Sequence, residues 1–331
     1  MAVFTEKPNT LFGSDVVVTM FDLGNVINRS LEGRKVAVKE IRIPVKFGHI
    51  AAKLWGSSDK RPILALHGWL DNAGTWDPLI PMIIKNRSIL AIDFPGHGQS
   101  TAFPLGMTYS LWELPQYILH IKEYFKWDRI SILGHSMGAI AALRFACIYN
   151  EDIDFLITID GLAYGTYNFN SLADKYPAVM HKALVAQTLV EQEPPAYTMD
   201  EIKEKWHLGS KKSVLLENAQ YLIKRGAIQS KKDPTKYCFS RDIRLKYVLF
   251  HPDNKAFLEV LFKRLKCPIL YIKAKDSPLS SNQFAAEMCE YIQTNNGKFS
   301  QKTVPGTHHV HLNNPEIVAP LILDFLKEHN V

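Results

Sequence analysis

The sequence predicts an α/β protein with an open, mostly parallel sheet that is interrupted by a helical insertion. Short apolar runs alternate with helical stretches up to residue 160, as in parallel strands joined by crossover helices. This alternation stops between residues 161 and 265, where helical patterns dominate. It resumes at residue 268 and continues towards the C-terminus. One α/β unit with an inserted cap accounts for all three observations.

The predicted strands begin with an antiparallel pair, residues 36–44 and 48–55, joined by a turn near Lys46. The later runs are short and apolar, as expected of strands buried on both faces. They comprise residues 62–66, 88–92, 130–133, 155–159, 268–274 and 298–304.

Helices are predicted between these strands and in the insertion, at residues 75–84, 110–125, 139–149, 171–192, 213–225, 281–294 and 315–328. Thr198 and Glu201 have the spacing of a capping box that opens a further helix. Asn314 and Pro315 are a typical N-cap and first helical residue for the last one. We therefore expect an N-terminal extension (1–35), a core (36–160 and 266–331) and a helical cap (161–265).

Composition favours an ordinary soluble globular protein. Of the 331 residues, 47% are hydrophobic and 22% are charged. No apolar run approaches the ~20 residues that span a bilayer, so stable membrane insertion is not expected. The N-terminus lacks the pattern of a secretory signal. Four widely spaced cysteines indicate free thiols and an intracellular, most simply cytoplasmic, location: Cys147, Cys238, Cys267 and Cys289.

The formal net charge of +6 comes from the predicted cap. Residues 161–265 contain 17 Lys and Arg against 11 Asp and Glu, and the rest of the chain is neutral. The basic pairs in this segment lack the interleaved aromatic residues of a single-strand binder, so no nucleic-acid partner is predicted. A solvated cap surface is the simpler interpretation. The sequence does not indicate an oligomeric state.

The strongest functional signal is Gly134-His135-Ser136-Met137-Gly138, which follows a predicted strand and opens a predicted helix. A serine on a sharp strand-to-helix turn projects its hydroxyl towards a base and an oxyanion site. The flanking glycines are needed because backbones approach closely around such a turn. Ser136 is therefore the candidate nucleophile of an acyl-transfer enzyme.

Such a serine needs a histidine base and a carboxylate that orients the base. The chain order serine, acid, histidine is typical of this turn and favours the histidines after the last strand. Of these, His308 comes earliest and is the predicted base. Asp276, which follows the strand at 268–274, is the predicted acid, and Asp160 after the strand at 155–159 is the alternative.

The oxyanion of an acyl-transfer intermediate needs preorganised N–H donors. The expected donors are the backbone N–H groups of Met137, which follows the nucleophile, and Trp69, in the loop after the strand at 62–66. No metal site is predicted, because the crowded histidines 308, 309 and 311 lack a matching set of ligands. No cofactor is predicted, because no G-x-G-x-x-G follows the first parallel strand.

With these residues assembled, the chain resembles the α/β-hydrolase superfamily from about residue 36 onward. The matching segments are 67–75, 93–100, 134–138, Asp276 and 306–315, and segments 67–75 and 241–246 resemble the serine hydrolase-like group. The resemblance implies an eight-stranded, mostly parallel sheet with a helical cap and a Ser136–Asp276–His308 triad. It also implies hydrolysis of a small substrate and, loosely, an association with peroxisomes or vesicles.

The expected function is that of a serine hydrolase that cleaves small esters or related acyl compounds through an acyl-enzyme. Serine at position 136 disfavours epoxide or halide chemistry, for which relatives of this fold use an aspartate nucleophile. The alternative is a catalytically silent protein that binds a small hydrophobic ligand on the same fold.

Overall fold

The computed structural model describes residues 30–31, 34–57, 61–85, 87–163, 169–248 and 253–329. Its centre is an eight-stranded sheet with the order β12-β11-β8-β7-β5-β6-β4-β3. The strands are β3 (Val38–Val45), β4 (Gly48–Trp55), β5 (Ile63–Leu66), β6 (Ile89–Ile92), β7 (Ile130–His135), β8 (Ile153–Ile159), β11 (Ile269–Ala274) and β12 (Phe299–Val304). The predicted fold class, and each of the eight predicted strands, is confirmed.

The sheet is parallel from β12 to β6 and antiparallel where β4 pairs with β6 and β3. The parallel strands are rich in Ile, Leu and Ala because helices cover both faces of the sheet. Their carboxyl ends lie along one edge, where open α/β sheets place their functional groups. In this sheet β7 lies directly beside β8, and β11 lies one strand further away.

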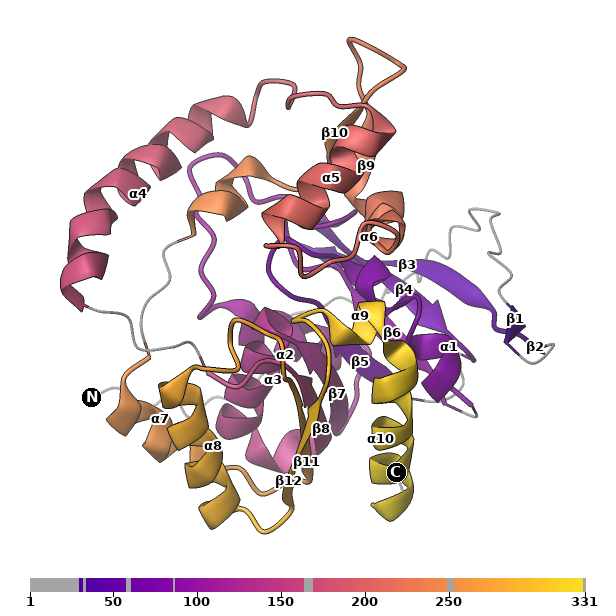
Figure 1. Ribbon diagram of the computed structural model, residues 1–331, viewed down its shortest axis with the longest axis vertical. Helices are drawn as coiled ribbons and strands as arrows, with labels where there is room; N and C mark the ends of the chain where they lie inside the picture. The colour runs from indigo at the N-terminus through magenta and orange to yellow at the C-terminus, as the bar shows by residue number, and fades with distance from the viewer. Residues whose placement is uncertain are drawn as a thin grey trace.

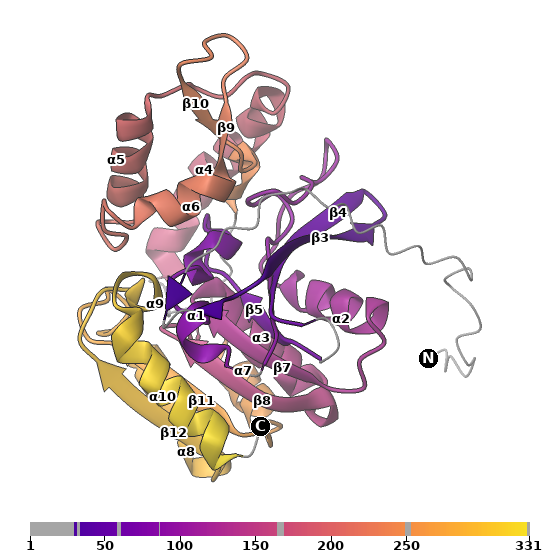
Figure 2. The same ribbon diagram turned by 90° about the vertical axis from the view of Figure 1, so that its right-hand side faces the viewer.

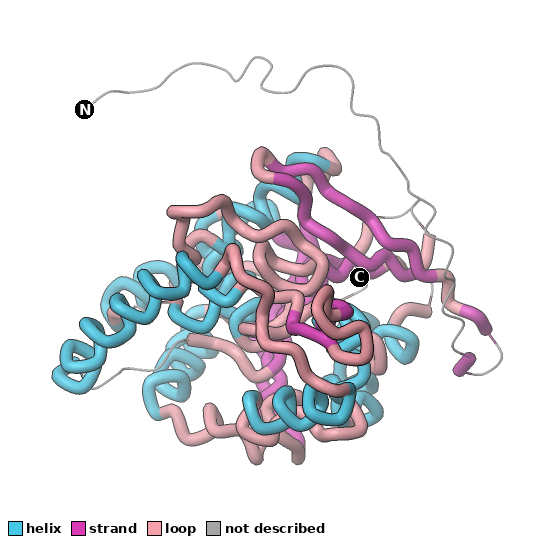
Figure 3. The backbone as a smooth tube through the Cα atoms, turned by 90° about the horizontal axis from the view of Figure 1, so that it is seen from above, coloured by secondary structure: helices cyan, strands magenta, loops and turns pink. Residues whose placement is uncertain are grey.

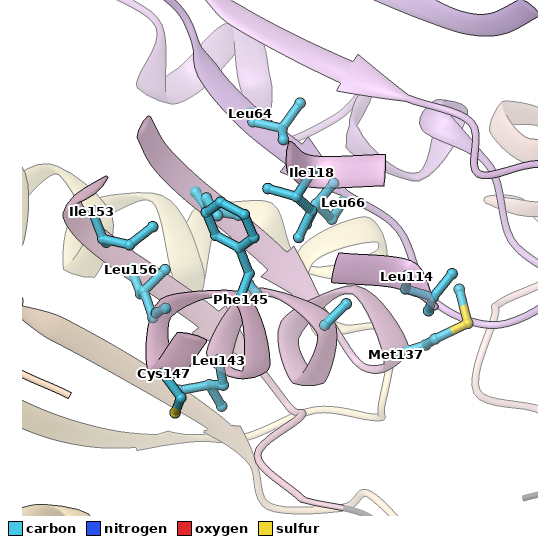
Figure 4. Close-up of a cluster of buried hydrophobic side chains, with 14 of the residues drawn as sticks. Leu64, Leu66, Leu114, Ile118, Met137, Leu143, Phe145, Cys147, Ile153 and Leu156 are labelled. Atoms are coloured by element: carbon cyan, nitrogen blue, oxygen red, sulfur yellow. The ribbon is translucent and has the colours of Figure 1, made fainter. Parts of the chain in front are cut away.

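Helices form a layer on each side of the sheet (Figure 1). One layer contains α2 (Leu114–Tyr124), α3 (Met137–Ile148), α7 (Lys255–Phe262) and α8 (Gln283–Asn295). The other contains η1 (Ala73–Trp76), α1 (Ile80–Ile83) and α10 (Pro315–Glu328). Figure 4 shows part of the main core, which lies between the sheet and the first of these layers. There Phe145 of α3 lies among apolar side chains of α2, β5 and β8. The short helix α9 (Val310–Asn313) precedes α10.

The insertion lies at the carboxyl end of the sheet, above the core in Figure 2. It contains α4 (Phe169–Leu189), α5 (Met199–Gly209), α6 (Ala219–Gly226), the hairpin β9 (Ala227–Gln229) and β10 (Tyr237–Phe239), and η3 (Ile243–Tyr247). Thr198 caps α5 through the predicted capping box with Glu201. A small separate core forms under α5 and α6 around Trp206 and Leu222. The long helix α4 runs along one side of the molecule (Figure 3).

Polar contacts, several of them buried, hold this insertion on the core. Asn72 Nδ2 donates to the carbonyl of Leu222 at 2.9 Å. The buried Arg225 forms ion pairs with Asp93 at 2.7 Å and Glu40 at 2.6 Å. In addition, the Tyr109 hydroxyl donates to Asp242 at 2.8 Å. Asp93 and Asp242 are both buried, so removing their partners would leave uncompensated buried charge.

The structure differs from the sequence-based expectation in three places. The hairpin β9–β10 is an element that the sequence does not predict. Helix α7, inside the range predicted for the cap, packs its Leu258 and Phe262 into the main core. The predicted helix at 75–84 is two short pieces, η1 and α1.

Most of the predicted extension 1–35 lies outside the described residues, apart from the short strands β1 (Ser30–Leu31) and β2 (Arg34–Lys35). The four cysteines are free, as predicted, and the structure buries all four. None of the helices in the described ranges combines the length and apolar character needed to cross a bilayer.

Candidate active site

Ser136 lies on a strained turn between β7 and α3. Its backbone has φ 51° and ψ −117°, a conformation that costs a non-glycine residue about 1–3 kcal/mol. The Ser136 N–H donates to the carbonyl of Ile159 at 3.0 Å, which fixes the turn against β8. A Cβ on Gly134 would lie 2.6 Å from the Ala139 Cα, and one on Gly138 would overlap the Leu66 carbonyl. The close approach of the neighbouring backbone thus explains why glycine is needed at both positions, as predicted.

Replacing Gly138 with alanine is expected to lower the free energy of unfolding by about 2–3 kcal/mol, because rigid backbone atoms of Leu66 and His67 must move. Chemical denaturation measures the change. The matched control is Gly209→Ala at the end of α5, where nothing lies within 4 Å of the new methyl group. This control should be neutral or stabilising, since alanine favours helix. Equal stability of the two variants would contradict the tight packing of the turn.

His308 lies in the loop between β12 and α9 and reaches the serine. Its Nε2 is 2.9 Å from Ser136 Oγ, and its Nδ1 is 2.5 Å from Asp160 Oδ2. A carboxylate only accepts, so Nδ1 carries the proton and Nε2 accepts from the Ser136 hydroxyl. The structure therefore brings together the predicted nucleophile and the predicted base.

The carboxylate that contacts His308 is Asp160, the alternative acid, and not Asp276. Asp160 directly follows β8, is 1% exposed and has a φ of 45°. Its Oδ1 accepts the N–H of Ala274 at 3.0 Å, which leaves Oδ2 to face the imidazole. Asp160 follows β8, the neighbour of the strand that leads into Ser136, and its fixed carboxylate is positioned to orient His308.

The prediction that Asp276 orients His308 is therefore wrong. Asp276 lies two residues beyond the end of β11 and is exposed. Its Oδ2 accepts the backbone N–H of Gly306 at 3.0 Å, so it closes the turn after β12. Asp276 and Asp160 both follow a strand. The order of the strands decides which carboxylate lies near Ser136, because β8, which leads to Asp160, adjoins β7 and β11 does not.

The loop after β5 passes close to the serine. A Cβ on Gly68 would lie 3.3 Å from the Ser136 Cβ, so this loop backbone lies against the nucleophile. Trp69 follows Gly68 and anchors its indole through a 2.9 Å hydrogen bond from Nε1 to the Leu245 carbonyl. Met137 is the first residue of α3. Met137 thus directly follows Ser136 in the sequence, and Trp69 directly follows Gly68, which lies against Ser136.

A small apolar pocket opens beside these residues. Its lining includes Trp69, Phe103, Tyr109, Leu114, Met137 and Val248. Met137 and Leu114, which come from α3 and α2, are both labelled in Figure 4. The pocket is thus lined by both predicted oxyanion residues and by apolar side chains of the core and of the segment after η3.

Two further histidines support the loops. The Nδ1 of His67 donates to the Gly68 carbonyl at 2.7 Å, and its Nε2 accepts the Phe94 N–H at 2.9 Å. His97 Nε2 accepts the N–H of Leu70 at 3.3 Å. Burial lowers the pKa of both imidazoles, which keeps them neutral. His97 therefore has a structural role, because its ring nitrogens contact backbone groups of two loops.

A second polar group, which the sequence does not predict, lies beside the group of Ser136, His308 and Asp160. It consists of Asp71, His135 and His309, whose potential ligand atoms all lie within 4.8 Å of one another. The three residues are far apart in the sequence and have no recognisable ligand spacing. The crowding of histidines after β12 was the only sequence signal for this group.

Comparison with known proteins agrees with this geometry. Residues 61–315 match the model of the alpha/beta hydrolase fold. A probable serine hydrolase of Drosophila melanogaster is 34% identical, over 88% of each chain. The human serine hydrolase-like protein 2 is 33% identical, over 88% of this chain and 94% of its own.

Among solved structures, a hypothetical protein from Pseudomonas aeruginosa PAO1 has a TM-score of 0.74 and 31% identity. The match covers 87% of this chain and 99% of that one. The expected resemblance is thereby confirmed on both sequence and structure. The chain belongs to the α/β-hydrolase fold family, within its serine hydrolase-like group.

Proposed function

We propose that this hydrolase cleaves small esters or related acyl compounds through an acyl-enzyme on Ser136. One observation carries the proposal: Ser136 Oγ, the His308 imidazole and the Asp160 carboxylate form a continuous hydrogen-bonded chain with distances of 2.9 and 2.5 Å. Nucleophile, base and orienting acid in this order make a neutral serine reactive towards an acyl carbon.

In the first half of the proposed reaction, Ser136 Oγ attacks the acyl carbon while His308 Nε2 takes the hydroxyl proton. The resulting imidazolium is stabilised by the Asp160 carboxylate at Nδ1. His308 then gives its proton to the leaving alcohol oxygen as the bond between acyl carbon and alcohol breaks. In the second half, a water molecule attacks the acyl-enzyme, again through His308, and releases the acid.

The tetrahedral intermediates place negative charge on the former carbonyl oxygen. The backbone N–H groups of Met137 and Trp69 are the proposed donors to it. Support comes from the start of α3 at Met137 and from the close approach of Gly68 to Ser136. Donors of this kind contribute about 3–4 kcal/mol each to transition-state stabilisation.

The substrate class follows from the pocket beside Trp69 and Met137. Its walls are apolar, which favours an uncharged, hydrophobic group of modest size. The buried, free cysteines support action in a reducing intracellular compartment, of which the cytoplasm is the simplest.

A panel of p-nitrophenyl esters with acyl chains of increasing length, and thioesters of the same acids, tests the proposal. We expect hydrolysis with highest kcat/KM for short or medium apolar chains. Hydrolysis of none of these compounds, combined with saturable binding of a hydrophobic ligand, would contradict the proposal and favour a silent binding protein.

A further inference from the structure

A buried carboxylate beside the active site has no hydrogen bond as short as 3.5 Å among the described residues. Asp71 is 3% exposed, and neither of its oxygens has a hydrogen-bond partner among the described residues. The nearby guanidinium of Arg241 attracts this carboxylate, but its Nη1 points to the Leu70 carbonyl at 3.5 Å. An ionised carboxylate in such surroundings is costly unless a cation or donors reach it.

Two imidazole nitrogens face Asp71. His309 Nε2 is 3.6 Å from Asp71 Oδ2, and His135 Nδ1 is 4.0 Å from the same oxygen. His135 is fully buried, and its Nδ1 also lacks a hydrogen-bond partner among the described residues.

The outer nitrogen of each imidazole is held by the protein. His135 Nε2 lies 2.9 Å from the His308 carbonyl, which only accepts, so Nε2 carries the proton and Nδ1 presents its lone pair to Asp71. His309 Nδ1 lies 2.7 Å from Ser213 Oγ, a hydroxyl oxygen that can accept from Nδ1 when Nε2 binds an ion. Metal-binding histidines are oriented in this way by a partner on the nitrogen that does not bind the metal.

We propose that Asp71, His135 Nδ1 and His309 Nε2 form a binding site for a divalent first-row transition ion such as Zn²⁺. One carboxylate and two imidazoles suit this ion, with a fourth position for water. Tetrahedral zinc with these donors separates ligand atoms by about 3.4 Å, given bonds of about 2.0–2.1 Å. The observed separations are 3.6 and 4.0 Å to Asp71, and all candidate ligand atoms lie within 4.8 Å of one another, so side-chain rotations must shorten them for an ion to bind.

The site connects two loops and the end of β7, all of which carry proposed catalytic groups. Asp71 lies two residues after Trp69 in the loop after β5, His135 ends β7 directly before Ser136, and His309 follows His308. The imidazoles of His135 and His308 are 4.7 Å apart between ring centroids. A bound dication would disfavour the imidazolium that forms on His308 during the reaction. We therefore expect the ion to inhibit turnover.

The binding test uses the Ser136→Ala protein, so that it does not depend on catalysis. Titration with Co²⁺ should give the visible absorption of tetrahedral cobalt, and calorimetry with Zn²⁺ should show one site per chain. Asp71→Asn and His309→Gln should each weaken Zn²⁺ binding at least about 100-fold. The exposed carboxylate of Asp276 provides the control, because Asp276→Asn should bind Zn²⁺ as the parent does.

Absence of both signals in a folded parent would overturn the site. Unchanged Zn²⁺ affinity in the variants would also overturn it, because the ion would then bind elsewhere. If Asp71→Asn does not fold, His309→Gln decides. In the protein with Ser136 intact, Zn²⁺ should reduce ester hydrolysis and a chelator should restore it. Hydrolysis that is insensitive to bound Zn²⁺ would refute the inhibition and leave the site.

Discussion

Replacing Ser136 with alanine is expected to lower kcat/KM for the best ester by about 10⁴-fold or more while the protein stays folded. The hydroxyl oxygen that forms the acyl-enzyme is lost, and only binding and oxyanion stabilisation remain. Steady-state kinetics measure the loss, and thermal unfolding checks the fold. Because alanine is similar in size to serine, the melting temperature should change little.

The matched control is Ser131→Ala on the same strand. Ser131 lies at the start of β7, at the opposite end of the strand from Ser136. It is buried, and its hydroxyl donates to Asp154 at 3.0 Å. This variant should keep kcat/KM within a few-fold of the parent. Comparable activity of the Ser136→Ala and Ser131→Ala proteins would contradict the role of Ser136.

Replacing Asp160 with asparagine is expected to lower kcat by about 10⁴-fold. Asparagine keeps the size of the side chain but offers an amide where His308 Nδ1–H now meets a carboxylate at 2.5 Å. The imidazole would then lose both its fixed tautomer and the charge that stabilises imidazolium. Steady-state kinetics over a range of pH measure the effect.

Asp276→Asn is the comparison that separates the two candidate acids. Asp276 accepts one backbone hydrogen bond at an exposed turn, so its variant should retain kcat within a few-fold. Loss of activity in Asp276→Asn with retention in Asp160→Asn would restore the acid first inferred from the sequence. Both variants should unfold cooperatively, which excludes misfolding as the cause.

The sheet could be predicted from the sequence because its strands are buried on both faces. Runs such as Ile63–Leu66 and Ile89–Ile92 contain only apolar residues, and such runs have few other uses in a globular protein. The hairpin β9–β10 was missed because it is short, half exposed and interrupted by a polar turn around Pro234. An isolated β-bridge between Tyr197 and Tyr237 adds a further contact to this hairpin.

The nucleophile and the base were found because each has a local signal. Ser136 is marked by its flanking glycines, and His308 by its place after the last strand. The acid has no such signal, since Asp160 and Asp276 both follow strands. Only the order of strands in the sheet and the direction of each carboxylate distinguish them. The group of Asp71, His135 and His309 forms only when two loops meet the end of β7.

Labelling with a fluorophosphonate, followed by mass spectrometry of the digested protein, tests the Ser136–His308–Asp160 arrangement most directly. This reagent phosphonylates serines that a neighbouring histidine has activated, whatever the natural substrate. We predict one adduct per chain, on the peptide that contains Ser136, and much slower labelling in the Asp160→Asn variant. A folded protein that takes up no label, or takes it up on another serine, would contradict the account.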